Sequence, residues 1–172
     1  MIWDLLLQSI YFFLPAYLAN MTPNLVKDIP FLHKPIWEAK LGSHKTWRGL
    51  LAGTIVGGIA FWLQQLAYNS GFTSLAIIDY HGFSTLFGFL LGFGALAGDS
   101  VKSYYKRKAN IAPGRPWIPW DQLDFVIGGI IASWLVYVPS VEIVVVLLLI
   151  SPFLHVLANY IGYLLHINSH KL

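Results

Sequence analysis

The chain has 172 residues, of which 56% are apolar, 16% aromatic and only 11% charged, with a formal net charge of +3 and no cysteine. This composition excludes an ordinary soluble domain and the length excludes several membrane domains, so we expect one all-α, polytopic membrane bundle over residues 1–172. The absence of cysteine excludes disulfides and zinc–thiolate sites.

Five apolar runs are candidate transmembrane helices, each of which needs about 20 residues to cross the hydrocarbon. They cover residues 2–18, 50–68, 83–97, 125–138 and 143–165. The third and fourth runs are short, and we expect them to gain length from the polar segment between them. The first run opens with Asp4 instead of a basic region, so it is not a cleavable signal and should stay in the mature protein.

The basic residues predict the orientation in the cell membrane. Of the 11 Lys and Arg, five lie between the first and second runs, five lie between the third and fourth, and the last is Lys171. The positive-inside rule places these segments and the C-terminus in the cytoplasm and the N-terminus outside, as five spans require. The two cytoplasmic loops therefore carry a charge that suits anionic headgroups or nucleotides.

The first cytoplasmic segment, residues 17–49, contains the string GSHKTWRG at residues 42–49. The string offers two hydroxyls and two cations, Ser43, Thr46, Lys45 and Arg48. A P-loop is rejected, because Trp37 stands where its first glycine would be and no strand precedes it. The cations alone are explained by contact with anionic lipid, but together with the hydroxyls and glycines they favour a polyphosphate site.

The second cytoplasmic segment, residues 98–125, combines three Asp with five Lys or Arg. Asp99, Lys102, Ser103 and Lys106 share one face if the third helix continues, because they are spaced i, i+3, i+4 and i+7. Asp121 and Asp124 share a face at the start of the next helix in the same way. Carboxylates that can hold Mg²⁺ thus lie in one segment with cations that can bind phosphates, as phosphoryl or nucleotidyl transfer requires.

A salt-bridged helix end is the structural alternative, with Asp99 paired to Lys102 or Lys106 and Asp121 as a cap. A cap accounts for one Asp and not for two. An ionisable side chain near the centre of a membrane helix also costs about 2.5–3.5 kcal/mol, with a smaller cost toward the interface. We therefore interpret the three carboxylates as functional, assign Lys106 and Arg107 to phosphate, and assign Lys108 to the lipid surface.

Other residues of these segments have structural interpretations. Close helix packing is expected at Gly88, Gly92, Gly98, Gly128 and Gly129. Trp117 and Trp120 suit the headgroup level. His166 and His170 are spaced i, i+4 but lack a third ligand, so a zinc site is not expected there.

Three blocks of the sequence together resemble the CTP-dependent phosphatidate cytidylyltransferases, and among them the archaeal CDP-archaeol synthase branch. The blocks are LPAYLANMTP at residues 14–23, GSHKTWRG at 42–49, and GDSVKSYYKRK with WDQLDF at 98–108 and 120–125. The signature of the wider family is matched by Ser103, Lys106, Arg107, Asp121 and Asp124. Gln122 stands where the bacterial type has Arg, and the His-Gly-Gly stretch is absent, so the cation that replaces this Arg stays open.

The resemblance implies an integral membrane cytidylyltransferase. Its reaction would join CTP to the phosphate of an unsaturated archaeal diether glycerol phosphate, 2,3-bis-O-geranylgeranyl-glycerol 1-phosphate, and release pyrophosphate. The metal ligands for Mg²⁺ would be Asp99, Asp121 and Asp124. The phosphate-binding groups would be Ser43, Lys45, Thr46, Arg48, Lys102, Ser103, Lys106 and Arg107, and the residues of the reaction itself Lys45, Lys106, Asp121 and Asp124. No nucleic-acid partner is expected, and a homodimer is left open.

Two other functions are weighed against this one. A CDP-alcohol phosphotransferase also uses membrane Asp and Mg²⁺, but its Asp-Gly-x-x-Ala-Arg motif is not present. A small transporter would place charges at mid-span on broken helices, whereas here they gather at one membrane face.

Overall fold

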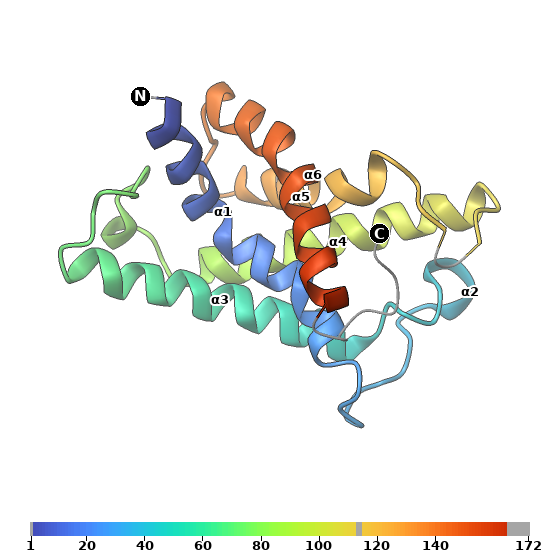
Figure 1. Cartoon of the computed structure of the whole chain (residues 1–172). Helices are drawn as coiled ribbons and strands as arrows, with labels where there is room; N and C mark the ends of the chain where they lie inside the picture. The colour runs from blue at the N-terminus through green and yellow to red at the C-terminus, as the bar shows by residue number, and fades with distance from the viewer. Residues whose placement is uncertain (1, 113–114, 165–172) are drawn as a thin grey trace.

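The computed structural model describes residues 2–112 and 115–164, and within these residues the protein is a bundle of helices (Figure 1). Its long helices are α1 (Ile2–Leu25), α3 (Trp47–Asn69), α4 (Leu86–Lys108), α5 (Trp120–Ser133) and α6 (Val141–Leu164). The short helix α2 (Glu38–Leu41) and the 3₁₀ helix η1 (Tyr80–Gly82) lie in the connections. In Figure 1, α1, α4 and α6 run in one direction and α3 and α5 return in the other. The predicted all-α class is confirmed.

The end of α4 and the start of α5 agree with the prediction, and the end of α1 does not. As predicted, α4 continues from its apolar run into the polar segment, through Lys108, and α5 begins at Trp120. The prediction was wrong for α1, which was expected to end at Leu18 but runs on to Leu25 with Pro15 and Pro23 inside it. Packing explains the difference, because Ala19 and Thr22 in this extension are buried. The first connecting segment therefore starts at residue 26.

Within the described residues, three helices, α1, α3 and α6, are long and apolar enough to cross a membrane. The polar end of α4 lowers its mean hydropathy, and α5 has 14 residues, which gives a length of about 21 Å against a hydrocarbon core of about 30 Å. Residues 86–97 of the predicted third run and 125–133 of the fourth are thus helical, while five complete crossings stay a prediction.

Glycines bring α3, α4 and α5 close together. A Cβ atom on Gly98 of α4 would overlap the backbone carbonyl oxygen of Asp124 and lie 3.0 Å from the Cα of Gly128 on α5. Between α3 and α4, a Cβ on Gly57 would lie 2.8 Å from the carbonyl oxygen of Gly88. The close packing predicted for the glycines of these helices is confirmed, and it brings the polar end of α4 against the start of α5.

Aromatic side chains fix the other end of the bundle. Phe61 of α3 lies between Tyr80 of η1 and Phe87 of α4, with ring centroids 5.4 Å from each, and Phe12 of α1 packs 6.3 Å from Phe87. All four side chains are almost completely buried. This cluster holds α1, α3 and α4 at fixed positions relative to one another.

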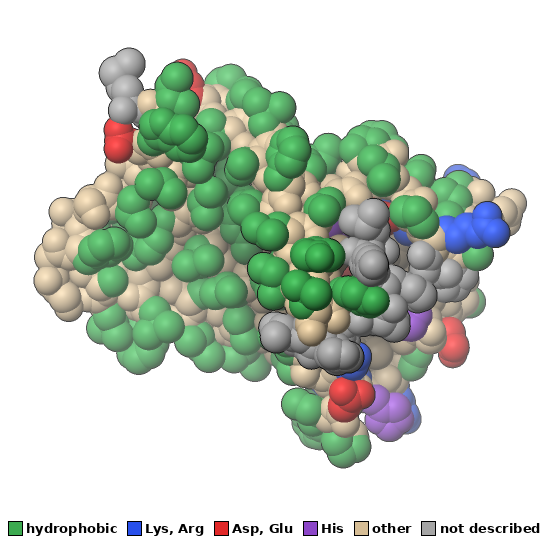
Figure 2. Space-filling view, in the orientation of Figure 1, with side chains coloured by type: hydrophobic (Ala, Val, Ile, Leu, Met, Phe, Trp, Pro, Cys, Tyr) green, Lys and Arg blue, Asp and Glu red, His purple; other side chains and the backbone are tan. Residues whose placement is uncertain are grey.

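Charge is separated along the bundle. On the face seen in Figure 2, Lys and Arg gather at the end that holds α2 and the C-terminal end of α4, and apolar side chains are spread over the rest. Every Lys and Arg of the described residues falls between 27 and 48 or between 102 and 115. Lys171, His166 and His170 lie outside the described residues. The side of the membrane that this charged end faces stays a prediction.

Candidate active site

Three carboxylates from two helices converge on one ammonium group. Helix α4 supplies Asp99 and Lys102, and the first turns of α5 supply Asp121 and Asp124. Lys102 Nζ lies 3.3 Å from Asp99 Oδ1, 2.8 Å from Asp121 Oδ1 and 3.0 Å from Asp124 Oδ2. The structure therefore brings together the three carboxylates that the sequence singled out, although they are up to 25 positions apart in the chain.

Two further lysines complete this cluster of three carboxylates and three ammonium groups, which we call the Asp–Lys cluster. Lys106, one turn beyond Lys102, donates to Asp121 Oδ2 at 2.8 Å and Oδ1 at 3.0 Å. Lys45, from the segment before α3, forms an ion pair with Asp99. The backbone N–H of Trp117 also donates to Asp121 Oδ2, at 2.6 Å. The six side chains are formally neutral together.

The Asp–Lys cluster is largely shielded from solvent. The exposed fraction of the side chain is 5% for Asp124 and does not exceed 24%, the value for Lys45. Removing a charge from water costs several kcal/mol unless a partner compensates it. The pairing is thus a condition for these carboxylates to stay ionised where they are, and any cation or anion that enters the cluster must rearrange it.

The groups of the GSHKTWRG string that could bind a phosphate have different contacts within the protein. The Thr46 hydroxyl caps α3 by accepting from the Gly49 N–H at 3.2 Å. The Trp47 and Arg48 N–H groups donate to the carbonyls of Lys34 and Leu32, at 3.2 and 2.9 Å. The first three amides of α3 are therefore already used within the protein, and a phosphate would meet side chains here instead of free amides.

Arg48 is the clearest departure from the expected phosphate contacts. Its guanidinium donates to the carbonyl of Lys27, at 2.6 Å, and to that of Ile29. It thus fixes the segment that follows α1.

Three other predicted phosphate ligands also lie outside the Asp–Lys cluster. Ser43 is exposed, and the Ser103 hydroxyl donates to the Asp99 carbonyl at 2.8 Å. Arg107 forms no ion pair within the described residues, and its Nε is buried without a hydrogen-bond partner.

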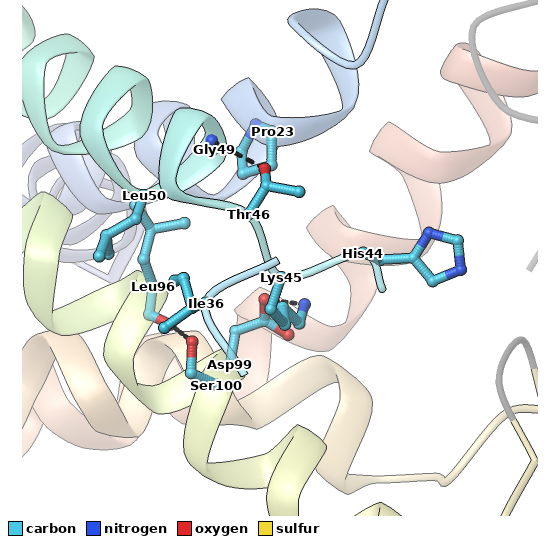
Figure 3. A pocket seen from close by; sticks show the side chains of 10 residues that line it. All are labelled: Pro23, Ile36, His44, Lys45, Thr46, Gly49, Leu50, Leu96, Asp99 and Ser100. Atoms are coloured by element: carbon cyan, nitrogen blue, oxygen red, sulfur yellow. Dashed lines mark hydrogen bonds and ion pairs between the residues drawn. The ribbon is translucent and has the colours of Figure 1, made fainter. Parts of the chain in front are cut away.

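A small cavity lies between the start of α3 and the polar part of α4 (Figure 3). Figure 3 shows Lys45 turned toward Asp99, while the His44 ring points away from both. Its volume of about 30 Å³ is enough for a water molecule and far too small for a nucleotide. Lys45 and Asp99 also line a second, larger cavity.

The larger cavity, of about 960 Å³, joins the Asp–Lys cluster to an apolar groove between α1 and α6. All six side chains of the cluster line its polar end. Its apolar wall comes from Ile10, Leu14, Leu18 and Met21 of α1 and from Leu154, Leu157 and Ile161 of α6. The groove exists because α6 buries a stripe at Ile143, Leu147 and Ser151 and then buries nothing before Gly162.

Sequence reasoning missed polar residues that line this cavity. They are Tyr17 and His155. The Tyr17 hydroxyl shares a hydrogen bond of 2.6 Å with the buried Ser151 hydroxyl behind it, and the His155 ring stacks on Phe125 with centroids 5.9 Å apart. A signal was present, because Ser151 and His155 continue the i, i+4 stripe of Ile143 and Leu147 along an otherwise apolar helix. Polar side chains at these positions of an apolar helix could have indicated that this face of α6 turns toward the site.

The donor set of the Asp–Lys cluster fits a divalent cation. Within residues 2–112 and 115–164 no group of three or more His, Asp or Glu side chains has an arrangement that could hold a metal ion, and Lys102 Nζ lies between the three carboxylates. Carboxylate oxygens are nevertheless the protein ligands that Mg²⁺ prefers. Asp99, Asp121 and Asp124 already direct one oxygen each at a single cation.

Comparison with known proteins gives a consistent result. The family described as CarS-like, CDP-archaeol synthase, matches residues 2–171. The CDP-archaeol synthase of Thermococcus kodakarensis is 37% identical over 163 residues, which cover 90% of each chain. That of Methanocaldococcus jannaschii is 32% identical over 176 residues, which cover 98% of each chain. A solved structure described as an intramembrane enzyme for archaeal membrane lipid biosynthesis is 33% identical, with a TM-score of 0.69 over 87% of this chain and 91% of the other.

Proposed function

This chain belongs to the CDP-archaeol synthase family, and from that premise we propose which substrates it joins and which residues act on them. It is a membrane enzyme, a CTP-dependent nucleotidyltransferase of archaeal lipid biosynthesis. The proposed acceptor is the phosphate of an unsaturated archaeal diether glycerol phosphate, and the proposed products are the CDP-lipid and pyrophosphate.

One observation carries the proposal, namely that a single cavity of about 960 Å³ has a charged end and an apolar groove. The two proposed substrates need these surfaces together. CTP is a polyanion, which the lysines of the Asp–Lys cluster can attract, and the acceptor has a phosphate joined to long isoprenoid chains. The groove between α1 and α6 suits such chains because aliphatic side chains form its walls.

The proposed reaction needs little general acid or base catalysis. An oxygen of the acceptor phosphate attacks the α-phosphorus of CTP, the bond from that phosphorus to the oxygen bridging to the β-phosphorus breaks, and pyrophosphate leaves. The attacking phosphate is already an anion, so no side chain must take a proton from it. The main barrier is repulsion between two anions, which fixed positive charge in a site shielded from water reduces.

The residues divide by position. Lys45, Lys102 and Lys106 line the large cavity and would bind the phosphates, since each presents an ammonium group there. Asp99, Asp121 and Asp124 would hold Mg²⁺, which when bound neutralises charge on the triphosphate and orients it for in-line attack. Thr46 and Arg48 support the segment that carries Lys45.

The test is pyrophosphate release from CTP by purified protein with Mg²⁺, measured with the unsaturated diether phosphate, its saturated form, a diester phosphatidate and no lipid. We expect release that depends on lipid and is fastest with the unsaturated diether. ATP, GTP and UTP in place of CTP test base choice in the same assay. No release from protein that is folded and binds CTP would contradict the proposal and indicate another headgroup reaction or transport.

A further inference from the structure

We propose that the Lys102 ammonium is a built-in counter-ion that holds the place of the divalent cation in the metal-free enzyme and withdraws when the metal binds. The inference rests on the proposed function, in which Asp99, Asp121 and Asp124 hold Mg²⁺. It goes beyond that function by giving the Lys102 ammonium two positions, one without the metal and one with it. In one it neutralises the carboxylates, and in the other it is free to meet the nucleotide phosphates.

The contacts single out Lys102 among the three lysines of the Asp–Lys cluster. Its Nζ is within 3.3 Å of an oxygen from each of the three carboxylates. Lys106 pairs with Asp121 and Lys45 pairs with Asp99. Lys102 donates a hydrogen bond to Asp121 Oδ1 and forms ion pairs with Asp99 and Asp124.

A metal ion and this ammonium cannot share the position. Mg²⁺ binds oxygen at about 2.0–2.1 Å in near-octahedral geometry and keeps several water molecules. Lys102 Nζ lies 2.8–3.3 Å from one oxygen of each of the three carboxylates, in the space between them that a shared metal ion would need. Metal binding by these oxygens must therefore displace the ammonium, which would otherwise repel the cation at contact distance.

Physical reasons favour a tethered cation here. Without any cation, three shielded carboxylates would repel one another and lose hydration without compensation. Lys102 has a flexible stem, and its side chain is 15% exposed and lines the large cavity. It can thus withdraw from the carboxylates into the space where the nucleotide phosphates would bind. Metal and nucleotide then support each other, because the metal frees a cation for the phosphates.

The expected effect follows from population arithmetic. If only a fraction of molecules has Lys102 withdrawn, the apparent metal affinity is reduced by that fraction. Replacing Lys102 by a neutral side chain removes this competition. We expect the dissociation constant for the metal to fall by about tenfold or more, which corresponds to a withdrawn fraction on the order of 10% in the metal-free protein.

The experiment measures binding and not turnover. Full-length protein in detergent micelles is titrated with Mn²⁺ in the absence of nucleotide, and free Mn²⁺ is followed by electron paramagnetic resonance. Lys102→Met is compared with the wild type and with two controls. Lys106→Met removes the same charge one turn away but leaves Asp99 and Asp124 untouched, and Lys108→Met removes an exposed charge. We expect the largest gain in affinity for Lys102→Met, a smaller gain for Lys106→Met and no change for Lys108→Met.

Thermal unfolding with increasing Mn²⁺ covers the case in which Lys102→Met folds poorly without metal. A ligand that binds only the folded state raises stability according to its affinity. We expect Mn²⁺ to raise the unfolding temperature of Lys102→Met more than that of the wild type. Equal or weaker Mn²⁺ binding by Lys102→Met would overturn the inference alone. No Mn²⁺ binding by either protein would overturn the metal site of the proposed function, and the inference with it.

Discussion

Two cations three positions apart in the chain, Lys45 and Arg48, have different partners. Lys45 pairs with a carboxylate and lines both cavities. Arg48 donates to backbone carbonyls at Lys27 and Ile29. At the scale of single residues, the same positive charge therefore acts in one case on a ligand site and in the other on the conformation of a segment.

Substitution by glutamine should separate these roles. Lys45→Gln should raise the KM for CTP by about tenfold, the equivalent of about 1.4 kcal/mol of lost binding, because the ammonium group that would contact the phosphates is removed. Arg48→Gln should lower the free energy of unfolding by about 1–3 kcal/mol, because two carbonyls lose their donors, while the KM for CTP stays near that of the wild type. Steady-state kinetics and thermal unfolding measure both. A raised KM in a fully stable Arg48→Gln protein would show that Arg48 binds phosphate.

At the scale of elements, the contact between α4 and α5 sets the distance between Asp99 and Asp124. Gly98 lies at its closest point, where a side chain would meet the Asp124 carbonyl. The two helices must separate if this position carries a methyl group.

Gly98→Ala should therefore lower both stability and activity. Overpacking costs about 1–3 kcal/mol, and the shift of α5 should weaken Mn²⁺ binding to the Asp–Lys cluster. The matched control is Gly82→Ala in η1, where the nearest atom to a new Cβ is Asp79 Oδ2 at 3.6 Å. Thermal unfolding and Mn²⁺ titration of both variants test the expectation. Equal effects of the two substitutions would show that the α4–α5 contact does not position the carboxylates.

The apolar groove between α1 and α6 gives a second prediction at this scale. Ala158 is partly buried and lines the groove, whereas Tyr160 is exposed and does not line it. Ala158→Trp should raise the KM for the lipid acceptor severalfold without changing the KM for CTP, because the new ring fills space needed by the isoprenoid chains. Tyr160→Trp should change neither. An unchanged lipid KM for Ala158→Trp would place the chains elsewhere.

At the scale of the whole molecule, the separation of charge predicts how the bundle sits in the membrane. The chain has no cysteine, so single cysteines report on one position each. Thr73 lies in the connection between α3 and η1, and Lys108 ends α4. In intact cells a membrane-impermeant thiol reagent should label Thr73→Cys and should label Lys108→Cys only after permeabilisation. The reverse pattern would invert the proposed orientation.

Much of the fold and part of the site could be predicted because they depend on local spacing. The turn that places Asp99 beside Lys102 and the apolar runs are properties of neighbouring residues. The extension of α1 past Leu18 could not be predicted, because burial of Ala19 and Thr22 against other helices decides it. The convergence of the carboxylates on Lys102 likewise depends on the register of α4 on α5. The roles of Arg48 and His155 depend on partners far away in the chain.

The most direct measurement follows the α-phosphate of CTP. Purified protein is incubated with α-³²P-CTP, Mg²⁺ and the unsaturated diether phosphate, and label in the lipid fraction is counted for the wild type, Asp121→Asn and Asp124→Asn. We predict transfer by the wild type only when metal and lipid are both present, and a loss of about 100-fold or more in each variant, since each keeps its shape but loses one charge. Near-normal transfer by either folded variant at saturating Mg²⁺ would remove that carboxylate from the site. No transfer of label to lipid by wild-type protein that is folded and binds CTP would contradict the proposed reaction.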